Sequence, residues 1–175
     1  MKKLIFSSLL LAVMFIFGSC SKDDTPAPGQ EVVEFDIQYN IFVASNAVTS
    51  TSQSKQLKDV LSAANQDKVN YVYSPSGIFR NKSYISVTGL TNVGGTLNNV
   101  SFTTTDKKIN FSLPIPTVSN DTIFYDDAYT DLLKLIGDYM ASNKSISLAL
   151  NYTAGNANIS EGVVKLHIST AFNWK

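Results

Sequence analysis

The sequence has few of the residues on which enzyme and metal sites are usually built. Among its 175 residues there is one cysteine, Cys20, one histidine, His167, and only three glutamates, Glu31, Glu34 and Glu161. A single cysteine leaves no partner for a disulfide within the chain. The 14 basic and 14 acidic side chains balance, and no basic patch is visible, so nucleic acid is not expected as a partner.

An apolar run long enough to span a membrane is also missing. Two lysines near the start precede an apolar stretch over residues 4–17, whereas a transmembrane helix needs roughly 20 apolar residues. The small residues Gly18 and Ser19 close this stretch directly before Cys20. A basic start, a short apolar core and small residues at its end are typical of a secretory signal, so we expect a signal peptide over residues 1–19.

The stretch Phe17-Gly18-Ser19-Cys20 resembles the lipobox of bacterial lipoproteins, although most lipoboxes carry leucine at the position of Phe17. The resemblance implies cleavage before Cys20 and acylation of both its thiol and its new amino group. More than one acyl chain gives a stable membrane anchor, because a single chain binds only marginally. Acylation would also remove the only thiol that could serve as a nucleophile or a metal ligand.

The next residues carry a second signal. Ser21-Lys22-Asp23-Asp24 resembles the Lys-acidic-acidic signal that sends lipoproteins of Bacteroidota to the outer face of the outer membrane. The resemblance implies a surface-exposed lipoprotein that is held in the outer membrane by its lipid and faces the extracellular side. Ordinary solvated linker charges are the alternative. We expect a lipidated tether over residues 20–30 and one folded domain over residues 31–175.

The folded part is rich in serine, threonine, asparagine, β-branched and aromatic residues, which favours strands over helices. Alternation of apolar and polar residues predicts seven strands. They lie near residues 33–43, 69–73, 84–90, 97–104, 109–113, 145–152 and 164–174. The last two are expected to pair antiparallel. Two stretches are predicted as turn-rich, namely 45–54 and Ser74-Pro75-Ser76-Gly77.

Two segments have helical periodicity. The first is short and places Leu57, Val60, Leu61 and Ala64 on one face. The second follows the aspartates near residue 126, and its predicted apolar face comprises Leu132, Leu133, Leu135, Ile136, Tyr139 and Met140. Together these elements predict an antiparallel β-sandwich of about seven strands with one or two short helices. A single sheet crossed by a helix, an α+β fold, is the alternative.

His167 is the first candidate for catalysis. Alternation puts it on the same face as Lys165 and Ser169, which favours a solvated or groove-facing side chain. A catalytic triad would need a positioned serine and acid, and no nucleophile-elbow motif is present. Glu34 lies on the polar strand face and Glu161 in a turn, so neither is placed like the paired carboxylates of a glycosidase.

The densest acidic group could hold a metal ion. It comprises Asp121, Asp126, Asp127 and Asp131, whose oxygen atoms are ligands of the kind that calcium prefers. The spacing lacks an EF-hand pattern, and the group lies at a predicted helix start, where negative charge is stabilising. Helix capping is therefore the leading interpretation, and no metal or other cofactor is expected.

Two further features bear on glycans. Asp121-Thr122-Ile123 resembles the Asp-(Ser/Thr)-apolar motif for O-glycosylation of exported Bacteroidota proteins, which marks Thr122 as a possible acceptor, with chance as the alternative. Several aromatic residues could form a stacking platform for sugars, although aromatics in strands usually belong to the core. The candidates are Tyr71, Tyr73, Phe79, Tyr84, Tyr152 and Trp174.

These observations favour a non-enzymatic cell-surface lipoprotein that acts as a binding or scaffolding module. The expected partner is a glycan or a surface protein of an adhesion or uptake complex. A hydrolase and a carrier of apolar ligands are the alternatives. A deep polar cleft would favour the hydrolase, a dry cavity between the sheets the carrier, and a flat or loop-formed surface the binding module.

Overall fold

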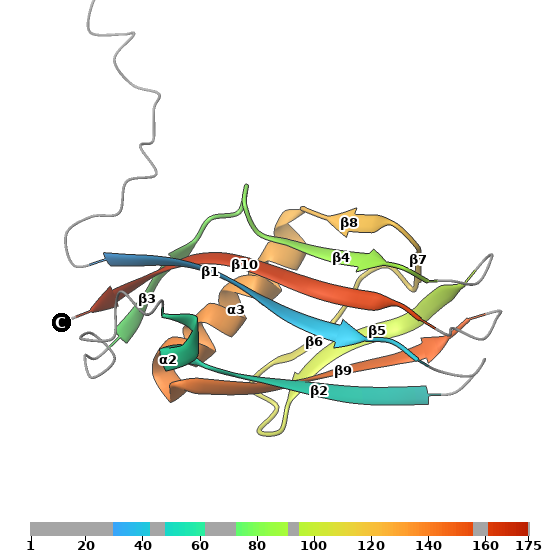
Figure 1. The fold of residues 1–175 in the computed structure, drawn as a ribbon, viewed down its shortest axis with the longest axis horizontal. Coiled ribbons are helices and arrows are strands. Elements are labelled where there is room, and N and C mark those ends of the chain that lie inside the picture. Colours follow the sequence, from blue (N-terminus) through green and yellow to red (C-terminus); the bar gives the residue numbers. More distant parts are fainter. Residues whose placement is uncertain (1–29, 43–47, 62–72, 91–94, 156–160, 175) are drawn as a thin grey trace, which may run out of the picture.

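The computed structural model describes residues 30–42, 48–61, 73–90, 95–155 and 161–174. These residues form two antiparallel sheets of five strands each, packed face to face (Figure 1). The predicted fold class, a β-sandwich, is confirmed, and the described part of the chain has ten strands instead of about seven. The predicted signal peptide and tether, with Cys20, Lys22, Asp23 and Asp24, lie outside the described residues.

The first sheet is built around the last strand of the chain. Its order is β1 (Gln30–Asn40), β10 (Val163–Trp174), β4 (Tyr84–Thr88) and β8 (Thr122–Phe124), and β3 (Tyr73–Ile78) also pairs with β10. One edge of β10 pairs with β1 over its whole length. The other edge pairs with β4 and then with β3, so β10 is the centre of this sheet.

The second sheet has the order β2 (Val48–Gln56), β9 (Ser145–Ala154), β5 (Thr96–Thr104) and β6 (Asn110–Ser112), and β7 (Thr117–Ser119) also pairs with β5. The predicted pairing of the strands 145–152 and 164–174 is wrong, because β9 and β10 belong to different sheets. Alternation identifies the buried face of a strand. It does not tell a neighbour in the same sheet from a strand across the core.

Strand β2 occupies a stretch that we predicted to be turn-rich. Its register places Thr51, Gln53 and Lys55 opposite the buried residues Leu150, Leu148 and Ile146 of β9, so polar side chains stand on its inward face as well as its outer one. An edge strand tolerates this, and inward polar or charged residues discourage pairing with other chains. A strand that is polar on both faces lacks alternation, which is why the sequence did not reveal it.

Strand β3 also replaces a predicted turn. Pro75 pairs with Phe172, and the register shifts between Ala171 and Phe172 of β10, which marks a bulge. Proline has no N–H for the ladder, so strands keep it at edges and bulges. Gly77 has a φ of +153° at this point. The short strands β7 and β8 lie in the predicted loop after Pro116, where three-residue strands carry too little pattern to be read.

The first helix, α2 (Leu57–Val60), begins where the periodicity begins but is a single turn. The backbone is already extended at Leu61, with φ −67° and ψ 121°. Ala64, which we placed on the same face, lies outside the described residues. Neither of the helices in the described part of the chain is long and apolar enough to cross a bilayer.

The second helix, α3 (Asp127–Asn143), contacts both sheets, through β3, β10 and β4 of the first and β9 of the second. Its apolar face buries Leu132, Leu133, Ile136 and Met140, as the periodicity predicted. The assignment of Leu135 to this face is wrong, because its side chain is 44% exposed. The sheets cover a narrower stripe of the helix than the apolar sequence suggests, and Leu135 lies outside that stripe.

The core fills the space between the sheets. Ile37, Leu166 and Ile85 form one row across the first sheet and are fully buried. The Tyr39 ring meets the Phe102 ring of the second sheet at a centroid distance of 6.1 Å. The Tyr39 hydroxyl donates a hydrogen bond of 3.0 Å to the Leu148 carbonyl, so its polar end is satisfied inside the sandwich, and burial raises its pKa.

A carboxylate ties the β5–β6 turn to α3. Asp106 accepts hydrogen bonds from the Thr104 hydroxyl at 2.7 Å, the Lys108 backbone N–H at 3.2 Å and the Tyr139 hydroxyl at 3.1 Å. These donors, with the Thr104 hydroxyl first, lower the pKa of Asp106 below its usual value, although burial opposes them. The ionised form is therefore the one that the fold stabilises.

We expect Asp106→Asn to reduce the loss of stability in acid. A carboxylate whose pKa is lowered by folding contributes stability above its unfolded pKa, about 4, and that contribution disappears as the pH falls through the folded pKa. Urea unfolding at pH 7 and pH 3 measures the difference. Asp59→Asn, an exposed change of equal charge on α2, is the control. Equal acid sensitivity of wild type and Asp106→Asn would contradict the assignment.

Candidate ligand-binding surface

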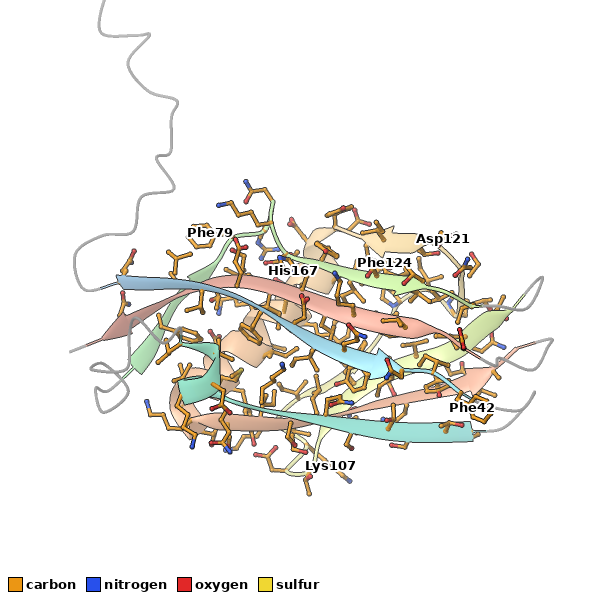
Figure 2. The ribbon with its side chains drawn as sticks, in the orientation of Figure 1. Phe42, Phe79, Lys107, Asp121, Phe124 and His167 are labelled. Carbon is orange, nitrogen blue, oxygen red and sulfur yellow. The ribbon has the colours of Figure 1, made fainter. Side chains whose placement is uncertain are left out.

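The outer face of the first sheet carries a row of side chains that contact one another. The register aligns Asp36 of β1, His167 of β10 and Tyr84 of β4, and His167 points outward because Leu166 and Ile168 are buried on the other face. His167 lies where β10 passes β4 (Figure 2). Its Nδ1 is 2.7 Å from Asp36 Oδ1, and its ring stacks on Tyr84 at 4.8 Å between centroids.

Two more polar groups flank this row. The Lys165 ammonium lies 5.2 Å from the centre of the Tyr84 ring. A hydrogen bond with Tyr84, and then the charge of Asp36, raise the pKa of Lys165, so it stays charged at neutral pH. On the other side, the Ser169 hydroxyl donates a 3.1 Å hydrogen bond to Glu34 Oε1. The charged groups of this face thus have partners within the face.

An exposed aromatic edge adjoins the row. Tyr125 is 57% exposed, and its ring is 5.7 Å from the Tyr84 ring at an angle of 52°. Ile123, which pairs with Ser86 of β4, is 48% exposed on the same side. We did not predict Tyr125 as a surface residue. The sequence signal that could have identified it is the alternation of Ile123, Phe124 and Tyr125. Since the Phe124 side chain is buried, its two neighbours point to the other side.

The structure separates the predicted aromatic candidates. Tyr84 lies on the outer face, Phe79 is half-buried, and Tyr152 belongs to the core. The remaining three lie outside the residues whose side chains are described, namely Tyr71, Tyr73 and Trp174. Tyr84, with its neighbour Tyr125, is therefore the described part of the predicted platform.

The pair of Asp36 and His167 resembles part of a catalytic triad. Asp36 fixes the orientation of the imidazole through Nδ1. Ser169, two residues after His167 on the same face of β10, donates its hydroxyl to Glu34. Within the described residues, no hydroxyl group makes a hydrogen bond with His167. The described arrangement therefore orients an imidazole without placing a nucleophile against it.

The acidic group near the start of α3 is organised by the one arginine of the chain. Arg80 Nη1 lies 2.9 Å from Asp127 Oδ1, and Arg80 Nη2 lies 2.7 Å from Asp131 Oδ1. Nη1 also donates a 2.6 Å hydrogen bond to the Thr130 hydroxyl. The hydrogen bond with Asp131 is the main cause of its raised pKa. Asp126 occupies the N-cap position, but its side chain makes no capping hydrogen bond. The predicted side-chain cap is therefore not formed, whereas Asp127 lies in the first turn, where its charge suits the helix dipole, and also pairs with Arg80.

The remaining acidic candidate, Asp121, lies in the turn before β8 with φ +55°, and its carboxylate accepts a 2.9 Å hydrogen bond from Asn120. Among the described residues, no three His, Cys, Asp or Glu side chains gather as metal ligands would. The Thr122 hydroxyl donates to the Ser119 carbonyl at 2.8 Å. A glycan on Thr122 would require this half-buried hydroxyl to give up that bond.

A hollow lies at the end of β1 remote from Gln30. Figure 2 labels Phe42, one of its lining residues, at this end. The hollow has a volume of about 340 Å³ and lies between the ends of β1 and β10, which the Ile41 N–H joins through a 2.7 Å bond to the Gly162 carbonyl. Phe42, 78% exposed, and Glu161 line it. This end of the molecule presents a second exposed aromatic side chain, Phe42, six residues after Asp36 along the chain.

Comparison of the chain with protein-family models, with curated proteins and with solved structures found no match.

Proposed function

We propose that the protein is a lipid-anchored binding module displayed on the outer face of the outer membrane, and that it is not an enzyme. The outer face of the first sheet is its ligand-binding surface. The supporting observation is the contacting row of Asp36, His167 and Tyr84, extended by Lys165 and Tyr125. These side chains stand on or beside paired strands, which hold a binding surface more rigidly than loops do.

The proposed anchor suits this surface. Gln30, the first residue of β1, follows Cys20 by ten positions, with nine residues between them. An extended chain spans about 3.3–3.6 Å per residue, so the tether reaches up to about 35 Å. That length lets the sandwich stand clear of the lipid headgroups, with its outer sheet face open to the medium.

The interior of the sandwich gives no support to the alternative of an apolar-ligand carrier. Tyr39, Tyr152, Phe102 and Phe172 are among the largest side chains of the core, and all are fully buried. They occupy the region between the sheets where such a ligand would lie. The proposal therefore places the ligand on the surface.

We expect Cys20→Ala to abolish anchoring. The variant has no thiol to acylate, so it should move from the detergent phase to the aqueous phase in detergent phase separation. Wild-type protein found in the aqueous phase would contradict the lipid anchor.

A matched variant with Lys22, Asp23 and Asp24 all changed to alanine keeps Cys20. It should stay in the detergent phase but become protected when intact cells are treated with protease. Unchanged digestion of this variant would mean that Lys22, Asp23 and Asp24 are only part of the linker.

A further inference from the structure

We propose that the ligand of this surface is a neutral carbohydrate, and that one of its sugar rings stacks on Tyr125. The inference rests on the proposed function, because it names the ligand class of that same surface. Three features carry it: an exposed and supported aromatic ring, hydrogen-bonding groups beside the ring, and charges that are paired within the face.

The proposed stacking surface is the ring of Tyr125. A pyranose ring has a face of C–H groups and a rim of hydroxyls, so it is recognised by a flat apolar surface with polar groups beside it. Tyr125 offers such a surface, since more than half of its side chain is exposed. Tyr84 supports it from one side, and Tyr84 is itself stacked on His167. A tyrosine has few torsions to fix, so a supported ring loses little entropy on binding.

The outer face of the first sheet also provides hydrogen-bonding groups for sugar hydroxyls. Each sugar hydroxyl can donate one hydrogen bond and accept others, so a sugar site needs both donors and acceptors. The Lys165 ammonium is a donor that lies against the Tyr84 ring. The Asp36 carboxylate is an acceptor in the same row, and one of its oxygens already holds His167. Lys165 lies against Tyr84, which in turn contacts Tyr125, and Asp36 lies one strand further away, against His167.

The balance of charge selects a neutral ligand. Asp36 lies 2.7 Å from His167 Nδ1, and Lys165 interacts with Tyr84 and with the charge of Asp36. Glu34 adds a second negative charge on β1 and bonds to Ser169. The described face therefore lacks the concentration of cations with which proteins hold sulfated or uronate-rich polymers. A neutral sugar needs no such field.

The opposite side of the sandwich supplies a comparison. Most outward residues of the second sheet are small hydroxyl and amide side chains; Val48 and Ala149 are outward too, and no aromatic ring is among the residues that the register places there. The hydroxyl and amide side chains include Ser50, Ser52, Ser54, Ser101, Ser147 and Asn151. This face has hydrogen-bonding groups but no stacking surface, so it should not retain the same ligand.

The first experiment screens the full-length protein, purified in detergent, against an array of neutral oligosaccharides of glucose, galactose, mannose and xylose beside sulfated and uronate-bearing ones. We expect a neutral oligosaccharide to bind. Tyr125→Ala should then lower its affinity at least tenfold, while Tyr125→Phe, which keeps the ring, should stay within about threefold. Phe42→Ala, an exposed aromatic at the far end of β1, is the control and should bind as wild type. Equal melting temperatures would show that the variants are folded.

The second experiment separates the ligand class from the binding surface. The photo-crosslinker p-benzoylphenylalanine replaces Ile123 on the first sheet or Ser52 on the second, and intact cells are illuminated. A carbohydrate adduct from position 123 but not from position 52 supports the inference. A protein adduct from position 123, with no neutral oligosaccharide bound on the array, overturns the carbohydrate ligand and leaves the surface in place. Adducts from neither position overturn both.

Two other array results would also overturn the inference. Binding confined to sulfated or uronate-bearing sugars would contradict the charge argument around Lys165 and Asp36. Unchanged affinity of Tyr125→Ala for a neutral oligosaccharide would remove the stacking ring from the site.

Discussion

Leu166→Ala is expected to lower the free energy of unfolding by about 2–5 kcal/mol, the usual range for a leucine deleted from a packed core. Leu166 is fully buried at the centre of β10, between Ile37 of β1 and Ile85 of β4. Both neighbours belong to paired strands, so they have little freedom to close the cavity. Urea unfolding of residues 25–175 measures the change.

The chain offers a matched control for this loss. Leu135→Ala makes the same chemical change on the exposed side of α3, and it should cost no more than about 0.5 kcal/mol. His167→Ala should fall between the two, at about 0.5–1.5 kcal/mol, because it loses a hydrogen bond to Asp36 and a stacked ring. If Leu135→Ala lowered the free energy of unfolding as much as Leu166→Ala, the orientation of α3 would be wrong.

Gly155→Ala should lower the free energy of unfolding by about 1–3 kcal/mol, because it overpacks a closed site. Gly155 lies against the first residue of β5, and its N–H donates a 2.7 Å hydrogen bond to the Thr96 carbonyl. A methyl group there would lie 1.8 Å from Thr96 Oγ1, 3.1 Å from Thr96 Cβ and 3.2 Å from Thr96 O. The hydroxyl can rotate away, but the Cβ and the carbonyl cannot move without disturbing the strand.

A second substitution identifies the cause. If the clash with the Thr96 side chain dominates, Thr96→Ala combined with Gly155→Ala should recover part of the loss, as a favourable coupling in a double-mutant cycle. Gly137→Ala is the matched control, because its new methyl would meet Thr170 Oγ1 at 3.4 Å, an ordinary contact. On a helix that change should stabilise by up to about 1 kcal/mol. A loss of stability as large as that of Gly155→Ala would mean that the site around Gly137 has less room than the 3.4 Å contact indicates.

Strands with one wet face were predictable from the sequence. Along β1, Val33, Phe35, Ile37 and Tyr39 alternate with polar residues, and the structure buries all four. The same pattern placed Leu166 and Ile168 inward and His167 outward on β10. In each case one side of the strand faces the core and the other faces water, so apolar and polar residues alternate along the sequence.

The predictions that the structure contradicts share a physical cause. β2 is an edge strand that is polar on both faces, so its sequence carries no periodic signal. β9 and β10 each alternate correctly, but the choice of pairing partner depends on strands elsewhere in the chain, such as β2 and β1. Leu135 is apolar without being covered, because burial of a helix face is decided by the width of the surface it packs on.

The candidate surface was only partly predictable. His167, Lys165 and Ser169 were placed on one face by alternation within β10, which is local information. Their partners Asp36 and Tyr84 come from strands more than 80 residues away, so no spacing along the sequence relates them. Arg80 joins Asp127 and Asp131 for the same reason, through a loop and a helix that meet only in the fold.

The central position of β10 also sets the order in which the fold can form. β1 is the first strand of the described chain, yet every residue of its pairing partner lies more than 120 residues further on. Contacts between such distant segments form slowly, because a long loop must close before they are made. The first sheet therefore needs Val163–Trp174 before it can form, and β1, β3 and β4 of a growing chain lack this partner until β10 is made. A chain that ends before Val163 leaves these three strands without the one partner that they share.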